Sequence, residues 1–154
     1  MSGFDRASWD RQAMQTTSCD DELRSGILGS VRKRPLFVYD PEFTVEVPDV
    51  GEVTVVIAYG GSFYTHLSAA EAGVTIEPDE IVDLICVGSA TKTPVNDAIA
   101  IEYPEDDDLG ILHGTIFTTP SDRDGVDSRN VCIFADGEVD RSPIGTGVSG
   151  RLAG

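Results

Sequence analysis

Apolar and polar residues alternate with a period of two in the first strongly patterned part of the chain. Phe43, Val45 and Val47 alternate with Thr44 and Glu46, which is typical of a strand with one buried face. A turn-forming sequence then precedes a second apolar run, Pro48-Asp49-Val50-Gly51 before Val53 to Tyr59. The pattern therefore predicts a β-hairpin.

The glycine pair Gly60-Gly61 interrupts the second run, and Phe63 to Leu67 resumes the strand pattern. Adjacent glycines within strands indicate a bulge or a close approach of two backbones. Helical spacing begins after Pro78, whose neighbours are acidic as is usual in the first turn of a helix. Apolar residues follow at helical intervals on both sides of Pro94, which predicts two short helices or one kinked helix.

The remaining pattern consists of strands and polar loops. Ile111 to Thr118 and Val131 to Phe134 are predicted strands, and Asp136-Gly137 is a tight turn into Val139. Residues 1–30 are polar and aperiodic, so we predict a poorly ordered extension there. Residues 31–154 are predicted to form a single α+β domain with a mainly antiparallel sheet packed on helix.

Charge narrows the possible partners. The net charge of −16 is spread along the chain and would repel phosphate backbones, which excludes nucleic-acid binding. Only Lys33 and Lys92 are lysines among 11 basic residues. Pervasive acidity with scarce lysine indicates a halophilic, salt-adapted protein, and an ordinary acidic protein is the alternative.

Cysteines and apolar runs indicate the compartment. Cys19, Cys86 and Cys132 are an odd number without metal-like spacing, so we expect a reducing, cytoplasmic environment. Cys86 and Cys132 lie in apolar runs and are interpreted as buried hydrophobes. No run approaches the ~20 residues that span a bilayer, and no membrane association is expected. The carboxylates of Glu105 to Asp108 favour a solvated loop over a metal site.

The most specific motif lies near the end of the chain. It resembles the signature of the proline racemase family, which also includes 4-hydroxyproline epimerases and trans-3-hydroxyproline dehydratases: Asp140-Arg141-Ser142-Pro143-Ile144-Gly145-Thr146-Gly147-Val148-Ser149. Further similar segments occur in the family's order between about Pro35 and Ala153. They are Val45-Glu46-Val47-Pro48, Ala58-Tyr59-Gly60-Gly61-Ser62-Phe63-Tyr64, His113-Gly114-Thr115-Ile116-Phe117 and Asn130-Val131-Cys132-Ile133-Phe134-Ala135-Asp136-Gly137.

The resemblance implies a fold and a chemistry. Family members have a diaminopimelate epimerase-like architecture of two similar halves, with the active site between them, and this chain would be most of one half, truncated at both ends. They are about twice as long, and their first catalytic cysteine lies in a Met-Cys-Gly-His segment that this sequence lacks. They need no cofactor, because two acid/base groups act on opposite faces of the substrate's α-carbon.

Ile144 occupies the position of the second catalytic cysteine of the racemases and of the threonine of the dehydratases. Its side chain can neither give nor take a proton, so we expect impaired activity. The family uses helix amino termini to hold the substrate carboxylate, and Gly145, Thr146 and Gly147 match such a terminus. A structural turn is the alternative role of these glycines, and a dinucleotide-binding loop is disfavoured because the fingerprint alone is weak.

Three further residues match family positions around the substrate. Asp140 corresponds to an aspartate that contacts the imino group, with turn or cap chemistry as its alternative role. Phe63 and Tyr64 are expected to wall the site, or else to pack in the core. His66 and His113 match no family histidine and are interpreted as structural.

Three hypotheses follow for the whole chain. It is a fragment or degenerate member of the family acting on a small imino acid, a noncatalytic carboxylate-binding module, or one subunit of a split enzyme whose missing half comes from a separate polypeptide. Dehydration of trans-3-hydroxyproline is a further alternative, because that route needs only one strong base. The base would come from outside this sequence.

Overall fold

The computed structural model describes residues 35–103 and 107–154. Within them, six strands form one sheet in chain order: β1 (Phe37–Val47), β2 (Gly51–Tyr59), β3 (Phe63–Ser68), β4 (Leu112–Pro120), β5 (Ser128–Phe134) and β6 (Glu138–Val139). Neighbouring strands are antiparallel except β3 and β4, which are parallel. The sheet is therefore mixed and mainly antiparallel, which agrees with the α+β domain that the sequence predicts. The extension predicted over residues 1–30 lies outside the described residues.

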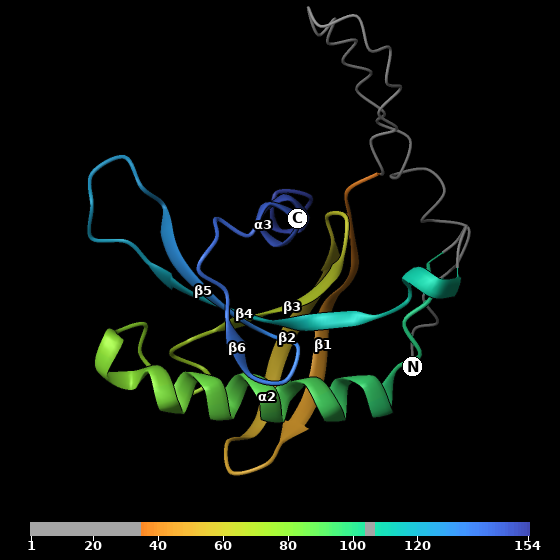
Figure 1. Ribbon diagram of the computed structural model, residues 1–154, viewed down its shortest axis with the longest axis horizontal. Coiled ribbons are helices and arrows are strands. Elements are labelled where there is room, and N and C mark those ends of the chain that lie inside the picture. Colours follow the sequence, from red (N-terminus) through yellow and green to blue (C-terminus); the bar gives the residue numbers. More distant parts are fainter. Residues whose placement is uncertain (1–34, 104–106) are drawn as a thin grey trace, which may run out of the picture.

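The described residues include two α-helices, which lie on opposite faces of this sheet. Helix α2 (Ile81–Ala98) covers one face and the short α3 (Gly145–Arg151) covers the other (Figure 1). Helix α2 also connects β3 to β4, because parallel neighbours need a crossover that returns the chain to the same end of the sheet. It is one helix that contains Pro94, and the alternative of two short helices is wrong. The described residues also form the short 3₁₀ helices η1 (Pro78–Glu80) and η2 (Asp107–Leu109).

The predicted hairpin is confirmed. Val47 pairs with Gly51, and the Val50 N–H donates to the Val47 carbonyl at 3.1 Å across the turn. Asp49 and Gly51 have φ values of 64° and 101°, which aspartate and glycine tolerate better than most residues. Strand β1 begins six residues before the alternation becomes visible, because the β1–β2 register shifts twice before Phe43.

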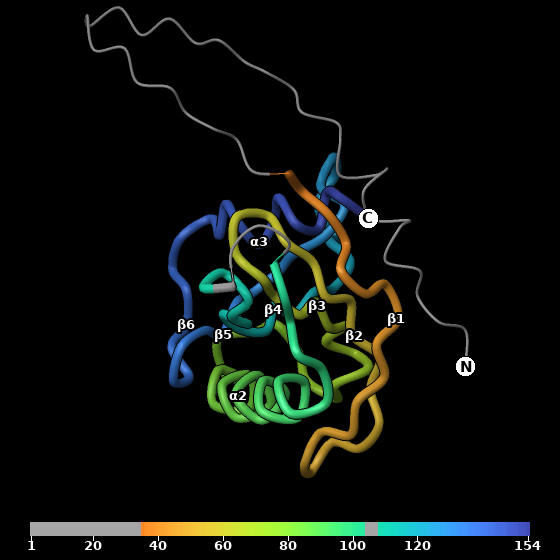
Figure 2. Tube along the Cα trace, turned by 90° about the vertical axis from the view of Figure 1, so that its right-hand side faces the viewer, coloured from red at the N-terminus to blue at the C-terminus, as the bar shows by residue number. Residues whose placement is uncertain are grey.

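The main core lies between the sheet and α2. Inward-facing strand residues pack against Leu84 and Val95 of the helix. Figure 2 looks along α2, which runs beside the sheet. Thr65 and Thr115 are buried in this layer and share a hydrogen bond of 3.1 Å, and Thr115 Oγ1 donates to the Gly88 carbonyl at 3.1 Å. Both hydroxyls are therefore satisfied, which removes the cost of burying them beneath the helix.

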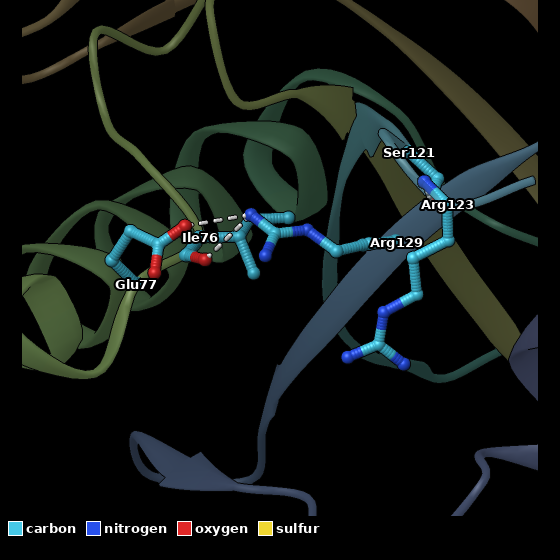
Figure 3. A network of polar contacts seen from close by, with 5 residues as sticks. All are labelled: Ile76, Glu77, Ser121, Arg123 and Arg129. Atoms are coloured by element: carbon cyan, nitrogen blue, oxygen red, sulfur yellow. Dashed lines mark hydrogen bonds and ion pairs between the residues drawn. The ribbon is translucent and has the colours of Figure 1, made fainter.

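An arginine on β5 forms hydrogen bonds and an ion pair with the segment before η1. Arg129 Nη2 donates to the Ile76 carbonyl at 3.1 Å and to Glu77 Oε1 at 2.8 Å, whereas Arg123 belongs to the loop before β5 (Figure 3). The two charged side chains are 40% and 55% exposed, so solvent screens the ion pair and it adds little to stability.

The two described cysteines have different environments. Cys132 is fully buried, as predicted, but Cys86 is exposed, and its interpretation as a buried hydrophobe is wrong. The reason is that only one side of α2 meets the sheet, and its buried residues are Leu84, Gly88, Thr91 and Val95. Among the described residues, no helix is long and apolar enough to cross a membrane. The same part of the chain contains no group of three potential metal ligands.

Candidate functional site

The signature begins with a turn built from its own side chains. The Asp140 N–H donates to the Cys132 carbonyl at 2.9 Å, which anchors the turn beside β5. Asp140 Oδ1 accepts the Ser142 N–H at 2.7 Å, and Ser142 Oγ accepts the Ile144 N–H at 3.1 Å. Such local bonds compete with regular structure and are typical of turns. Asp140 therefore has the turn role that the sequence offered as its alternative. Its second carboxylate oxygen takes no part in the hydrogen bond from Ser142.

Ile144 stands directly before α3 in a left-handed conformation. Its φ and ψ are 52° and 58°, a region that β-branched residues rarely adopt. The side chain is only 5% exposed and packs in a small cluster with Tyr64, Ile116 and Cys132. Residue 144 is thus apolar, buried and strained, at a cost of about 1–3 kcal/mol.

The next three residues begin α3. The first helical bond joins the Val148 N–H to the Ile144 carbonyl at 2.9 Å. The N–H groups of Gly145, Thr146 and Gly147 therefore precede the first bond of the helix, where amides have no intrahelical acceptor. Gly145 and Thr146 are exposed, and Gly147 is buried. The helix start thus offers donors at the surface of the protein.

The two glycines of this helix start differ in what surrounds them. A Cβ on Gly147 would lie 2.3 Å from Ile116 Cδ1 and 2.8 Å from Ile144 Cγ2, so packing alone requires a glycine there. A Cβ on Gly145 would meet no atom of the described chain within 4 Å. Packing therefore explains Gly147 but not Gly145.

The predicted close approach at Gly60 is confirmed. A Cβ on this residue would lie 2.1 Å from the Thr146 carbonyl oxygen and 2.3 Å from the Gly150 nitrogen. A Cβ on Gly61 would lie 2.9 Å from Thr146 Cγ2. Gly60 and Gly61, directly after β2, therefore cannot carry side chains, because α3 packs against the backbone at this point.

Tyr64 joins the sheet to the start of α3. It lies on the α3 side of β3, is 8% exposed and packs with Ile144. Burial raises the pKa of its phenol, and a hydrogen bond with the Thr146 side chain opposes that rise. The phenol is therefore protonated at neutral pH beside the helix start.

Phe63 lies apart from the other predicted site residues. It is fully buried in the main core, with its ring 5.6 Å from that of Tyr39 and 4.8 Å from that of Tyr59. Consecutive strand residues point to opposite faces, so Phe63 and Tyr64 cannot both face α3. Of the two aromatic residues, Tyr64 stands at the site and Phe63 has the core role.

Cys132 is close to this cluster but is not a reactive thiol. Burial, with a smaller contribution from the nearby Asp140 carboxylate, raises its pKa to about 12. Nucleophilic cysteines need a stabilised thiolate, so Cys132 is a packing residue.

The two histidines have contrasting surroundings. His66 is 8% exposed, and burial together with Arg151 lowers its pKa to about 4. His113 is exposed, and its ring centroid lies 5.9 Å from that of Tyr64. Sequence reasoning interpreted both as structural, but His113 lies at the candidate site. No sequence signal could have shown this, because it depends on the pairing of Tyr64 with Gly114 between β3 and β4.

Sequence and structure comparisons agree on the chain's relatives. The model of the family described as proline racemase matches residues 14–154, and so begins before the resemblance found at Pro35. A trans-3-hydroxy-L-proline dehydratase of Colwellia psychrerythraea is 45% identical over 77% of this chain and 34% of its own length. A trans-L-3-hydroxyproline dehydratase of Xenopus tropicalis is 43% identical over 83% of this chain and 38% of its own.

Solved structures give the same result. A hydroxyproline epimerase from Agrobacterium vitis with bound trans-4-OH-L-proline matches with a TM-score of 0.73 and 31% identity, over 79% of this chain and 35% of its own. A probable proline racemase from Agrobacterium radiobacter with bound carbonate has the same TM-score at 28% identity and the same coverage. This chain thus spans about a third of the length of these relatives. The match over residues 14–154 establishes that the chain belongs to the proline racemase family.

Proposed function

We propose that this chain forms the carboxylate-holding part of a binding site for proline or hydroxyproline. The observation that carries the proposal is Gly145. It lies at the start of α3, packing does not require a glycine there, and a Cβ would project into open space. A ligand carboxylate that approaches the backbone N–H groups would explain the glycine, because a side chain at residue 145 would block this approach. The names of two structural relatives support this, since one has bound carbonate and the other bound trans-4-OH-L-proline.

Within this proposal, residue 144 does not exchange the substrate's α-proton. Racemisation and epimerisation need a group that removes a proton on one face and another that delivers one on the other. Ile144 has no exchangeable proton and is buried among apolar neighbours. The chain therefore binds the imino acid without performing that step through residue 144.

The second group of the site would belong to a diaminopimelate epimerase-like second half. One form of this proposal is a split enzyme, in which a separate polypeptide supplies this half. A noncatalytic carboxylate-binding module is the alternative. Adding the amino-terminal half of a relative to this chain distinguishes them, because only the split enzyme gains dehydratase turnover, which needs no proton transfer at residue 144.

A second candidate reaction is the dehydration of trans-3-hydroxyproline. The relatives from Colwellia psychrerythraea and Xenopus tropicalis are both named as dehydratases of this compound. The family resemblance implies a threonine at position 144 in the dehydratases, and Ile144 has the same branching at Cβ. Elimination of water needs one strong base for the α-proton, and that base would belong to the second half.

Calorimetry on a single variant tests the binding proposal. Gly145→Ala adds a methyl group where the ligand carboxylate would approach, so we expect the affinity for L-proline to fall at least tenfold. Thermal unfolding is the control and should be unchanged or slightly improved, since alanine favours helix over glycine. An unchanged affinity in a folded Gly145→Ala protein would rule out the helix start as the carboxylate site.

A further inference from the structure

His66 lies buried beneath α3 without a hydrogen-bond partner. It shares a face of β3 with Tyr64, because strand residues two apart point to the same side, and Tyr64 packs with Ile144 at the start of α3. Both ring nitrogens of His66 are buried and have no partner among the described residues. Buried polar groups are nearly always paired, so an unpaired imidazole in this position calls for a reason other than packing.

The surroundings of His66 oppose its protonation. The charged side chain that acts on it is Arg151, a cation on α3. Its partners on the adjacent strands, Val56 of β2 and Ile116 of β4, carry no charge. Burial raises the pKa values of the titratable groups in the same layer, which therefore stay protonated and neutral in acid: Tyr64 and Cys132. A proton on His66 would thus place a second positive charge beside Arg151 in a buried layer.

Helix α3 is a small cover that can leave the sheet without unfolding the main core. It has 7 residues and lies against β1, β2 and β3. The buried cluster beneath it is separate from the main core, which lies on the α2 side of the sheet. Elements that bury little apolar surface open at a lower free energy than the core does. Exposure of His66 to water therefore requires only the release of α3.

We propose that His66 makes the imino-acid site sensitive to pH, because its protonation releases α3 from the sheet and with it the helix start that holds the ligand carboxylate. The inference rests on the proposed function, since the site that is lost is the one at Gly145 and Thr146. The ligand binds the docked helix, and the proton binds the released state. Each therefore lowers the affinity of the protein for the other.

The two protonation equilibria of His66 set the sign and the size of the effect. Its pKa is about 4 with α3 docked, and it returns to the ordinary value of 6.5 when the ring is in water. Between these values the released state binds more protons, so a lower pH favours release. From pH 7.5 to pH 5.5, the ratio of released to docked molecules should rise about tenfold.

Amide hydrogen exchange measures the release of α3 without a ligand. Val148 and Leu152 donate helical hydrogen bonds of 2.9 and 3.1 Å. Their protection factors, corrected for the intrinsic exchange rate at each pH, should fall about tenfold from pH 7.5 to pH 5.5. Low urea should leave the exchange of these amides unchanged, whereas it should accelerate amides of the β1–β2 hairpin, which open only by global unfolding. Equal urea dependence of both groups would contradict a separate release of α3.

Two variants separate titration from packing. His66→Leu removes the imidazole, so the protection of α3 should no longer depend on pH in this range. Val56→Ala is the matched control, because it trims the β2 partner of His66 and leaves the titrating group in place. This variant should keep the pH dependence of the wild type. His66→Gln, which does not titrate either, replaces His66→Leu if that protein does not fold.

Calorimetry with L-proline at the same two pH values measures the effect on the ligand. The charges of L-proline do not change in this range, so a loss of affinity comes from the protein. We expect the affinity to fall by about twofold to tenfold in the wild type and in Val56→Ala, and to stay nearly constant in His66→Leu. A constant affinity in the wild type, or a loss that persists in His66→Leu, would overturn the role of His66 and leave the carboxylate site intact. Absence of binding to the folded chain at pH 7.5 would overturn both proposals.

Discussion

Acidification should destabilise this protein through one buried side chain, His66. Its two ring nitrogens are buried and have no hydrogen-bond partner among the described residues. Burial, with a contribution from Arg151, lowers its pKa from 6.5 to about 4 in the folded protein. The unfolded chain therefore binds a proton at His66 near pH 6.5, and the folded protein does so only near pH 4.

The sign and size of the effect follow from this difference. Between these two pH values the unfolded state binds more protons, so the free energy of unfolding falls as the pH is lowered. A difference of about 2.5 in pKa corresponds to about 3 kcal/mol, lost between about pH 6.5 and pH 4. Below pH 4 both states are protonated, and His66 contributes no further loss. A loss of this size is a large part of a typical domain's stability.

Urea unfolding followed by circular dichroism at pH 7, 5.5 and 4 measures the effect. His66→Leu removes the titrating imidazole and fills its buried position beneath α3 with an apolar side chain. His113→Gln is the matched control, because it removes the other, exposed histidine. Titration of the carboxylates is common to all three proteins and cancels in the comparison. The stability gap between wild type and His66→Leu should change by about 3 kcal/mol across this range. A gap that is constant with pH would refute the reasoning.

Four further outcomes are expected. Gly60→Ala should destabilise the protein by about 1–3 kcal/mol in urea unfolding, because the methyl group collides with the Thr146 carbonyl, whereas Gly145→Ala should not; equal effects would contradict the close approach. Ile144→Gly should cost about 1–3 kcal/mol less than Ile116→Gly, since glycine releases the left-handed strain at residue 144, and equal costs would show that the strain is absent. The melting temperature should rise from low to molar salt because screening weakens the repulsion of a −16 net charge, and a salt-independent value would end the halophilic interpretation. Polarimetry should detect no racemisation of L-proline by the chain alone, and turnover would contradict the role assigned to Ile144.

Local pattern was sufficient to predict the parts of the fold that are local in origin. The β1–β2 hairpin followed from alternation and one turn. The start of α3 was implied by the family resemblance of the signature and not by periodicity. The parallel pairing of β3 with β4 did not, because strand periodicity does not identify the partner of a strand. The exposure of Cys86 was missed for a similar reason, since an apolar run does not say which side of α2 meets the sheet.

The site was predicted to the extent that its chemistry lies in the signature. Asp140, Ile144 and the glycines are close together because they are consecutive, and the sequence could name them. Alternation implied that Phe63 and Tyr64 face opposite sides but not which of them faces α3, since that depends on where the helix packs. The position of His113 at the site depends on a one-residue shift between two strands, which leaves no pattern in the sequence.

The most direct test of the account is to map where an imino acid binds. L-proline is titrated into isotope-labelled protein while the backbone amide signals are followed by NMR. The account predicts saturable shifts centred on Gly145, Thr146 and Gly147, with a smaller shift at Tyr64. Saturable shifts elsewhere, or none in a protein whose spectrum shows it to be folded, would contradict the claim that the start of α3 holds the ligand carboxylate.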